Sequence, residues 1–209
     1  MIKTLNYDKI PEYASIVLNG KRRSGKGVLT RDLVKNVISR RKIRNAYLFA
    51  PTANIAQNPM NFIPEKNRYL ELDLEVIDSI MKYQEEIIKE DPKGNHAILI
   101  CIDDIVGSIN NKQKAVLNKI FILGRHLQIY LIYSVQSVKN EFTPTQRQNT
   151  DLIFIFNQSN FYNKEQLSLE YLSLNMDKKT GIKLKDGNID NYIFKYTAEY
   201  PIKDFSLKF

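Results

Sequence analysis

The chain has little of what disulfide-stabilised, zinc-binding and membrane-spanning proteins need. Its 209 residues include one cysteine and two histidines, so no internal disulfide can form, and His96 and His126 are too few to predict a zinc site. No apolar run of about 18 residues occurs, and residues 1–7 lack the apolar stretch of a signal peptide. We therefore expect a soluble protein that is not secreted and has no membrane span.

Positive charge is in excess and lies mainly in the first quarter of the chain. The net charge is +8 and the isoelectric point is near 9.4. Residues 1–50 hold twelve Lys or Arg against three acidic residues, which gives this segment a charge of +9. This excess favours a polyanionic partner such as nucleic acid or nucleotide phosphates, although a solubilising surface has the same composition.

Apolar runs alternate with helical patterns along most of the chain. Buried strands are predicted at 14–18, 45–50, 97–102, 127–135 and 152–156, and helices at 29–38, 74–88 and 112–123. This alternation predicts an α/β fold with a mostly parallel central sheet flanked by helices. The polar segments that lead up to residue 73 and surround Pro144 are expected to be loops.

The pattern changes after residue 157. A helix is predicted at 164–174, and the Asp186-Gly187 turn between 182–185 and 192–196 predicts a β-hairpin. The length and the apolar content of 43% fit one globular domain. We therefore expect a single domain over residues 1–209, with a core at about 14–157 and a C-terminal elaboration at about 158–209.

The segment Gly20-Lys21-Arg22-Arg23-Ser24-Gly25-Lys26-Gly27 matches the G-x-x-x-x-G-K phosphate loop, or Walker A motif. It lies between a predicted strand and a predicted helix, as this motif requires; the alternative is a glycine turn that ends the strand. In a phosphate loop, backbone N–H groups at the helix N-terminus surround the phosphates, and Lys26 reaches the β- and γ-phosphates of ATP. The loop and Val28 after it are the predicted ATP-binding residues.

One position departs from the motif. The hydroxyl residue that normally follows the lysine and binds Mg²⁺ is Gly27 in this chain. Magnesium must then be held by Asp103, phosphate oxygens and water. The substitution has three interpretations: a tolerated variation, a weakened ATPase or an altered sequence.

Acidic and polar side chains follow the later strands. Asp103 and Asp104 end a buried strand, as in a Walker B motif, where the first carboxylate holds Mg²⁺ and the second polarises the attacking water. The alternative is a turn or a helix cap. Gln136 ends the strand 127–135 and is a candidate sensor of the γ-phosphate, or a polar residue that begins a loop. Arg125, before that strand, is a candidate arginine finger.

Four motifs together resemble the packaging ATPases of the FtsK/HerA superfamily, especially the poxvirus and virophage type. They are Gly-Lys-Arg-Arg-Ser-Gly-Lys, Ile-Asp-Asp after a strand, Gly-Arg-His-Leu, and Tyr-Ser-Val-Gln. The resemblance covers residues 14–157 and implies a RecA-like (ASCE) P-loop NTPase fold. It also implies ATP and Mg²⁺ as ligands, Lys26 on phosphate, Asp103 on Mg²⁺, Asp104 as catalytic base, Gln136 as sensor and Arg125 as a finger acting on a neighbouring subunit.

The resemblance implies an ATP-hydrolysing motor that moves viral double-stranded DNA into a preformed capsid. Its expected partners are DNA, capsid or portal-vertex proteins and other copies of the chain in a hexameric ring, in the host cytoplasm, a viral factory or the virion. Candidate DNA-binding residues are Lys112, Lys114, Lys139 and Arg147. The alternatives are a P-loop nucleotide kinase and a non-catalytic nucleotide- or DNA-binding protein with a decayed site.

Overall fold

A computed structural model describes residues 5–105, 110–137 and 141–156, together with the backbone of two further strands at 192–195 and 205–206. The strands are β1 Ser15–Asn19, β2 Asn45–Phe49, β3 Arg68–Tyr69, β4 Ile98–Ile102, β5 Ile129–Val135, β6 Leu152–Ile155, β7 Tyr192–Lys195 and β8 Phe205–Ser206. The helices are α1 Lys26–Arg40, α2 Leu74–Glu90, α3 Asn111–Leu123 and α5 Pro144–Gln148, with 3-10 turns η1 Tyr7–Lys9 and η2 Glu65–Asn67.

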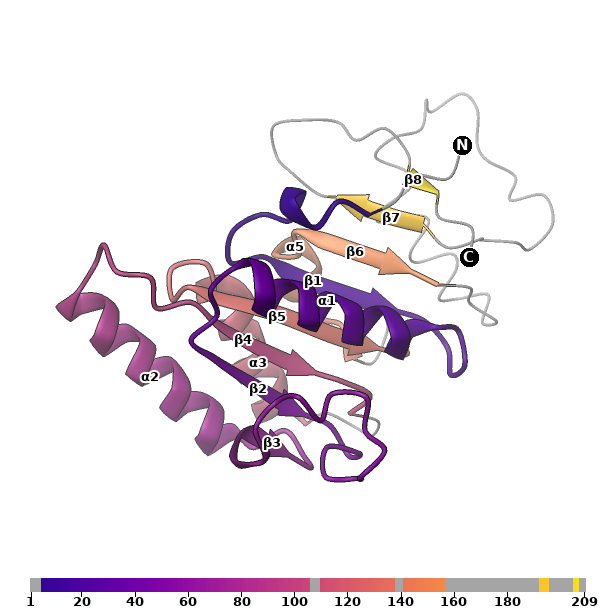
Figure 1. Cartoon of the computed structure of the whole chain (residues 1–209), viewed down its shortest axis with the longest axis horizontal. Coiled ribbons are helices and arrows are strands. Elements are labelled where there is room, and N and C mark those ends of the chain that lie inside the picture. The colour runs from indigo at the N-terminus through magenta and orange to yellow at the C-terminus, as the bar shows by residue number, and fades with distance from the viewer. Residues whose placement is uncertain (1–4, 106–109, 138–140, 157–191, 196–204, 207–209) are drawn as a thin grey trace.

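The strands form one sheet in the order β3-β2-β4-β5-β1-β6-β7-β8. The strands from β3 to β6 in this order run parallel, and β7 and β8 continue the sheet in antiparallel pairing. Strand β5 lies between β1 and β4, so the strands that end in the phosphate loop, in Gln136 and in Asp103 are neighbours (Figure 1). The predicted fold, a mostly parallel α/β sheet of the P-loop ATPase type, is confirmed.

Helices cover both faces of the sheet, which explains why the central strands are apolar throughout. Every residue of β1, β4 and β5 is buried. Leu33 and Val37 of α1 pack with Leu18 on one face, whereas α2 and α3 pack on the other through residues such as Ile77 and Leu117 (Figure 1). Because successive side chains of a strand point to opposite faces, each central strand contributes to both cores.

Two segments expected to be loops contain regular structure. Pro144–Gln148 forms the short helix α5, whose first turn is stabilised by a reciprocal cap between Thr143 and Gln146. A proline at the first helical position fits this geometry, because no intrahelical bond needs its missing N–H. The segment before residue 73 contains η2 and the edge strand β3, which is too short to leave a recognisable pattern.

The C-terminal strand is confirmed, and its sheet neighbours are β6 and β8. Residues 192–195 form β7, which pairs antiparallel with β6 on one side and β8 on the other. The predicted helix at 164–174 and the predicted hairpin strand at 182–185 lie outside the described residues. None of the helices in the described part of the chain is long and apolar enough to cross a membrane.

Candidate functional site

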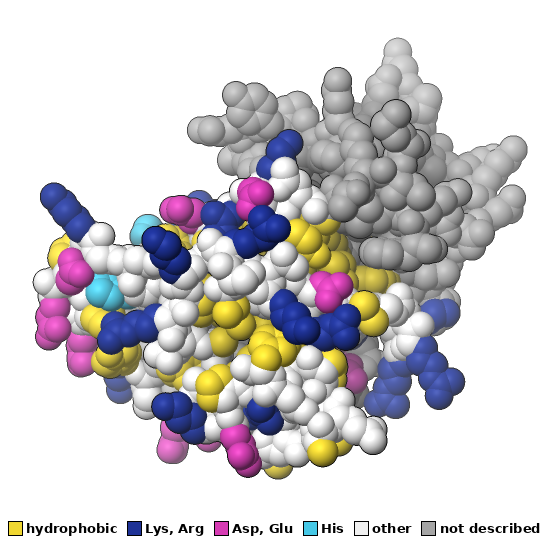
Figure 2. Space-filling view, viewed as in Figure 1, with side chains coloured by type: hydrophobic (Ala, Val, Ile, Leu, Met, Phe, Trp, Pro, Cys, Tyr) yellow, Lys and Arg dark blue, Asp and Glu magenta, His cyan; other side chains and the backbone are white. Residues whose placement is uncertain are grey.

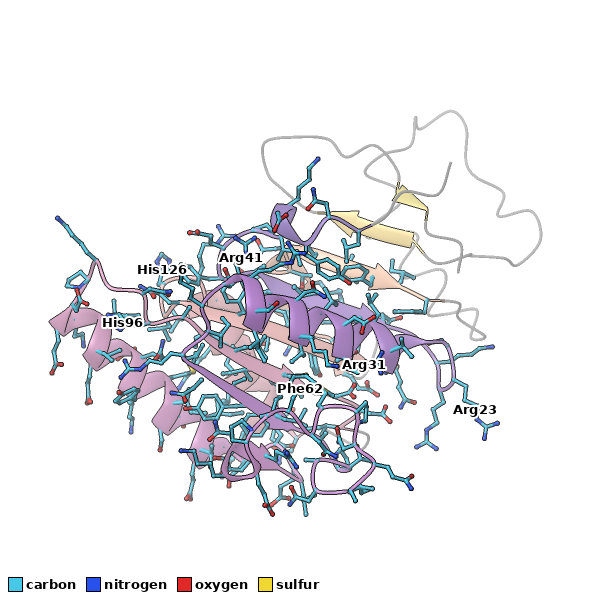
Figure 3. All side chains as sticks on the ribbon, viewed as in Figure 1. Arg23, Arg31, Arg41, Phe62, His96 and His126 are labelled. Atoms are coloured by element: carbon cyan, nitrogen blue, oxygen red, sulfur yellow. The ribbon has the colours of Figure 1, made fainter. Side chains whose placement is uncertain are left out.

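A cavity of about 410 Å³ opens at the carboxyl edge of the parallel strands. Seven of the nine predicted ATP-binding residues line it, and Asp103 and Asp104 face the same space. Its lining comprises Lys21, Arg22, Arg23, Gly25, Lys26, Gly27, Val28, Arg31, Pro59, Asp103 and Asp104. The structure therefore brings the phosphate loop and the two aspartates to one cavity, as the sequence predicts. In Figure 2, Lys and Arg side chains gather at the edge where Arg23 projects in Figure 3.

Two glycines of the phosphate loop are required by its shape. A Cβ atom on Gly20 would lie 2.7 Å from both the Phe156 Cβ and the Ser24 Oγ, so no larger residue fits without displacing the loop. Gly25 is the N-cap of α1 and has a φ of 92°, a conformation that L side chains rarely adopt. The loop is thus held closely against Phe156, while the N–H groups at the start of α1 face the cavity.

Lys26 is the buried cation of the site. It is 7% exposed, and its ammonium group donates to the Val135 carbonyl at 3.3 Å and lies 3.8 Å from Asp104 Oδ1. Burial lowers the pKa of Lys26, while the negative charges of Asp104, Asp103 and Glu141 raise it. A buried cation with so few anionic contacts favours a further anion in the cavity, such as a phosphate.

The two aspartates differ in environment. Burial raises the pKa of Asp103; the nearby Ser134 hydroxyl, although outside ordinary hydrogen-bond geometry, and the Lys26 charge oppose this shift, and Asp104 adds to it. Asp104 is more exposed and has a φ of 49°, in the left-handed region. Its Oδ1 accepts a hydrogen bond from Gln136 Nε2. The end of β5 therefore contacts the second aspartate directly.

The donors fit a magnesium ion that is shared with a nucleotide. Mg²⁺ is usually bound through one or two carboxylates, phosphate oxygens and water. The described residues contain no group of three or more His, Cys, Asp or Glu side chains suited to a metal, so Asp103 would hold the ion together with phosphate. A Cβ atom on Gly27 would meet nothing within 4 Å. The space that a P-loop hydroxyl normally fills is open in this chain.

Arg125 lies at the opposite edge of the sheet. Its Nη2 is 2.5 Å from Asp151 Oδ1, and Asp151 Oδ2 accepts from the backbone N–H of Ser15, the first residue of β1. Figure 3 shows the same separation, because His126, the next residue, and Arg23 of the phosphate loop lie on opposite sides. Arg125 is thus far from the cavity of its own chain, as the sequence argument expects.

The candidate DNA-binding residues do not form one cluster in the described structure. Lys112 is exposed and Lys114 partly exposed on the first turns of α3. Arg147 donates to the Phe142 carbonyl at 2.6 Å, so its guanidinium takes part in fixing the segment around α5. Lys139 lies outside the described residues.

Three residues near the site are missed by the motif reading. Arg31 lines the cavity four residues after Gly27, a helical spacing that could have revealed it. Pro59 reaches the cavity from the segment between β2 and η2 and belongs to no motif. Glu141 accepts hydrogen bonds from the backbone of Gln136 and Ser137, and its position in the sequence gives no hint of this contact.

We expect Lys26→Ala to lower nucleotide affinity and hydrolysis by orders of magnitude, because the charge that neutralises the terminal phosphates is removed. The fold should survive, since the side chain makes only polar contacts with Val135 and Asp104. Calorimetric titration with a non-hydrolysable ATP analogue checks this, with Lys35→Ala on the exposed part of α1 as the matched control. Near-normal binding by Lys26→Ala would refute the phosphate-loop assignment.

We expect Gly27→Ser to tighten Mg²⁺-dependent binding of ATP, because the open space accepts the side chain and its hydroxyl adds a metal ligand. Replacing a helical glycine should also stabilise the fold by about 0.5 kcal/mol. Analogue titrations over a range of Mg²⁺ concentrations measure the first effect. Gly20→Ser, which has no room, should instead lose binding. An unchanged magnesium dependence in Gly27→Ser would mean that the metal is held fully without that hydroxyl.

The fold is shared with solved ATPases at low sequence identity. The genome packaging NTPase B204 from Sulfolobus turreted icosahedral virus 2, in complex with AMPPCP, matches with a TM-score of 0.57 and 16% identity over 88% of this chain and 92% of that chain. B204, the DNA-packaging ATPase from Sulfolobus turreted icosahedral virus, gives 0.59 and 17% over 88% and 93%. The cytoplasmic domain of the Thermomonospora curvata type VII secretion ATPase EccC gives 0.62 and 13% over 95% of this chain and 26% of that chain.

The family follows from the sequence rather than from these structures. No curated protein sequence matches the chain. The family described as Poxvirus A32 protein matches residues 3–186, well over half of the 209 residues. This match spans the phosphate loop, both aspartates, Arg125 and Gln136, and it confirms the resemblance that these motifs indicated. The chain belongs to the Poxvirus A32 protein family.

Proposed function

We propose that this chain is an ATPase that moves viral double-stranded DNA into a preformed capsid. The observation that carries the proposal is the line of polar contacts at the mouth of the cavity. Lys26 lies beside Asp104, and Asp104 accepts a hydrogen bond from Gln136, while Asp103 faces the same space. A cation for the phosphates, a carboxylate for the metal, a second carboxylate and an amide are the groups that ATP hydrolysis needs.

The proposed reaction follows from the positions of these groups. The terminal phosphates of ATP would replace Asp104 as the partner of Lys26, which leaves the Asp104 carboxylate free to accept a proton from the attacking water. The Gln136 amide would orient that water. Asp103 would hold Mg²⁺, which neutralises charge on the phosphate oxygens when it is bound. The two aspartates would thus have separate tasks, set by the greater burial of Asp103.

The position of Arg125 supports an assembly of several subunits. The strand β1 spans roughly 16 Å at about 3.3 Å per residue, and Arg125 lies at the end remote from the phosphate loop. An arginine there is better placed to reach the nucleotide of a neighbouring copy than its own. We propose a homo-oligomeric ring, a hexamer, in which Arg125 acts in trans.

DNA as the translocated partner is supported by charge and by relatives. The segment 1–50 carries a charge of +9, and exposed cations can contact phosphates without reading sequence. B204 is named as the DNA-packaging ATPase of its virus, and the same activity is proposed for this chain. We place it with capsid or portal-vertex proteins in the host cytoplasm, a viral factory or the virion.

The two alternatives account for fewer observations. A decayed, non-catalytic site would not need Gln136 and Asp104 in contact at the edge of a nucleotide-sized cavity. A nucleotide kinase needs an acceptor site, and a coupled assay with nucleoside monophosphates as acceptors tests for one. Phosphoryl transfer to such an acceptor would overturn the proposal.

Double-stranded DNA is expected to stimulate ATP hydrolysis at low salt, because contact with phosphates would be coupled to turnover. DNA affinity should fall by about 10³-fold or more between about 50 and 200 mM salt if several phosphates are neutralised, and stimulation should fall with it. Phosphate release with and without DNA measures this, with Asp104→Asn as the inactive control. A rate that ignores DNA at low salt would remove the translocation proposal.

Arg125→Ala is expected to bind ATP normally but to hydrolyse it about 10³- to 10⁵-fold more slowly, because a finger acts in the transition state. Asp151→Asn is the matched control, since it breaks the ion pair and leaves the guanidinium in place. Mixed assemblies of Arg125→Ala and Asp104→Asn subunits should regain activity, because one subunit supplies the finger and the other the base.

Two outcomes would count against the trans finger. Equal loss of activity and of thermal stability in Arg125→Ala and Asp151→Asn would show that the pair only supports the sheet edge. The absence of recovered activity in mixed assemblies that demonstrably form would lead to the same conclusion.

A further inference from the structure

A carboxylate that the proposed reaction does not use bonds to the backbone of the sensor residue. Glu141 Oε2 accepts from the N–H of Gln136 at 2.8 Å and, more weakly, from the N–H of Ser137 at 3.4 Å. The N–H of Glu141 donates to the Ser137 carbonyl at 3.2 Å. The chain therefore returns to the end of β5, where the Glu141 carboxylate holds the first two amides beyond the strand.

Glu141 is itself fixed by the hydrophobic core. The hydroxyl of Tyr133, a residue that is 2% exposed, donates to the Glu141 carbonyl at 2.8 Å. Burial raises the pKa of Tyr133, and the Glu141 charge adds to this shift, so the hydroxyl stays a donor. The next residue, Phe142, is buried and packs near Phe121 with ring centroids 6.2 Å apart. The carboxylate thus has a rigid support on both sides.

Gln136 links Glu141 to the site by two different groups. Its backbone N–H bonds to Glu141, and its side-chain amide bonds to Asp104 Oδ1. Because the carboxylate fixes the peptide that precedes the Gln136 side chain, it restricts where that amide can point. Glu141 does not line the nucleotide cavity. Any effect it has on hydrolysis must therefore pass through Gln136 or through its charge.

We propose that Glu141 is a positioning residue for ATP hydrolysis, which holds Gln136 in the orientation that reaches Asp104 and the attacking water. The inference rests on the proposed ATPase activity. A hydrogen bond from an amide to a carboxylate is short and strong compared with one between neutral groups, which suits this task. The bond leaves the Gln136 side chain free to serve the reaction while its backbone is fixed.

Glu141→Ala is expected to lower kcat by about 10- to 100-fold, the usual cost of losing a supporting partner of a catalytic group. Affinity for a non-hydrolysable ATP analogue should be unchanged or slightly tighter, because a negative charge near Lys26 is lost. Glu141→Gln, which keeps an oxygen acceptor without the charge, should recover most of the rate. Glu85→Ala, an exposed position on α2, is the matched control.

A double substitution separates positioning from general damage. If Glu141 acts through Gln136, the variant Gln136→Ala/Glu141→Ala should hydrolyse ATP no more slowly than Gln136→Ala alone. Losses that multiply in the double variant would overturn the proposal. So would an equal loss of kcat in Glu141→Gln and Glu141→Ala, because it would assign the effect to charge.

Amide hydrogen exchange gives a readout that does not depend on turnover. The amide of Gln136 should exchange faster in Glu141→Ala than in the wild-type protein, and Glu141→Gln should restore protection. Unchanged exchange would overturn the positioning role. Wild-type protein that never hydrolyses ATP would overturn the proposed function and this inference together, whereas an active wild type with normal kcat in Glu141→Ala would overturn this inference alone.

Discussion

The burial of the Lys26 ammonium group is the constraint on which the nucleotide-binding edge depends. A cation that is 7% exposed loses most of its hydration, and in the described structure its side chain contacts only the Val135 carbonyl and the more distant Asp104. The loop that encloses it depends on glycine at two positions, because Gly20 lies against Phe156 and Gly25 has a positive φ. A phosphate group is the partner that this arrangement lacks.

The strand order turns this local feature into a site. Because β5 lies between β1 and β4, the residue that ends β5 reaches the aspartate that follows β4, and the Val135 carbonyl reaches Lys26. The neighbour on the other side, β6, continues into Phe156, which supports the phosphate loop. Four parallel strands therefore contribute to one edge. Glu141 adds a contact from the segment after β5, so the sensor side of the site is held by its own return to the core.

Most of the fold and the centre of the site could be predicted from the sequence, because both depend on local patterns. Continuous apolar runs revealed the buried strands, and the glycine spacing with Lys26 and the Asp103-Asp104 pair revealed the cavity lining. The rest depends on contacts between residues far apart in the chain. The bond of Glu141 to Gln136, the pairing of Arg125 with Asp151 and the approach of Pro59 to the cavity need tertiary structure. The edge strand β3, with two residues, was too short to show a period.

Single-turnover hydrolysis by the wild-type protein and by Asp104→Asn tests the central claim most directly. Asp104 contacts both Lys26 and Gln136, and replacing its carboxylate with an amide removes the proton acceptor while preserving the size of the side chain. The account predicts that both proteins bind ATP with similar affinity and that only the wild type releases phosphate at an appreciable rate. Equal rates of phosphate release in the two proteins would contradict it.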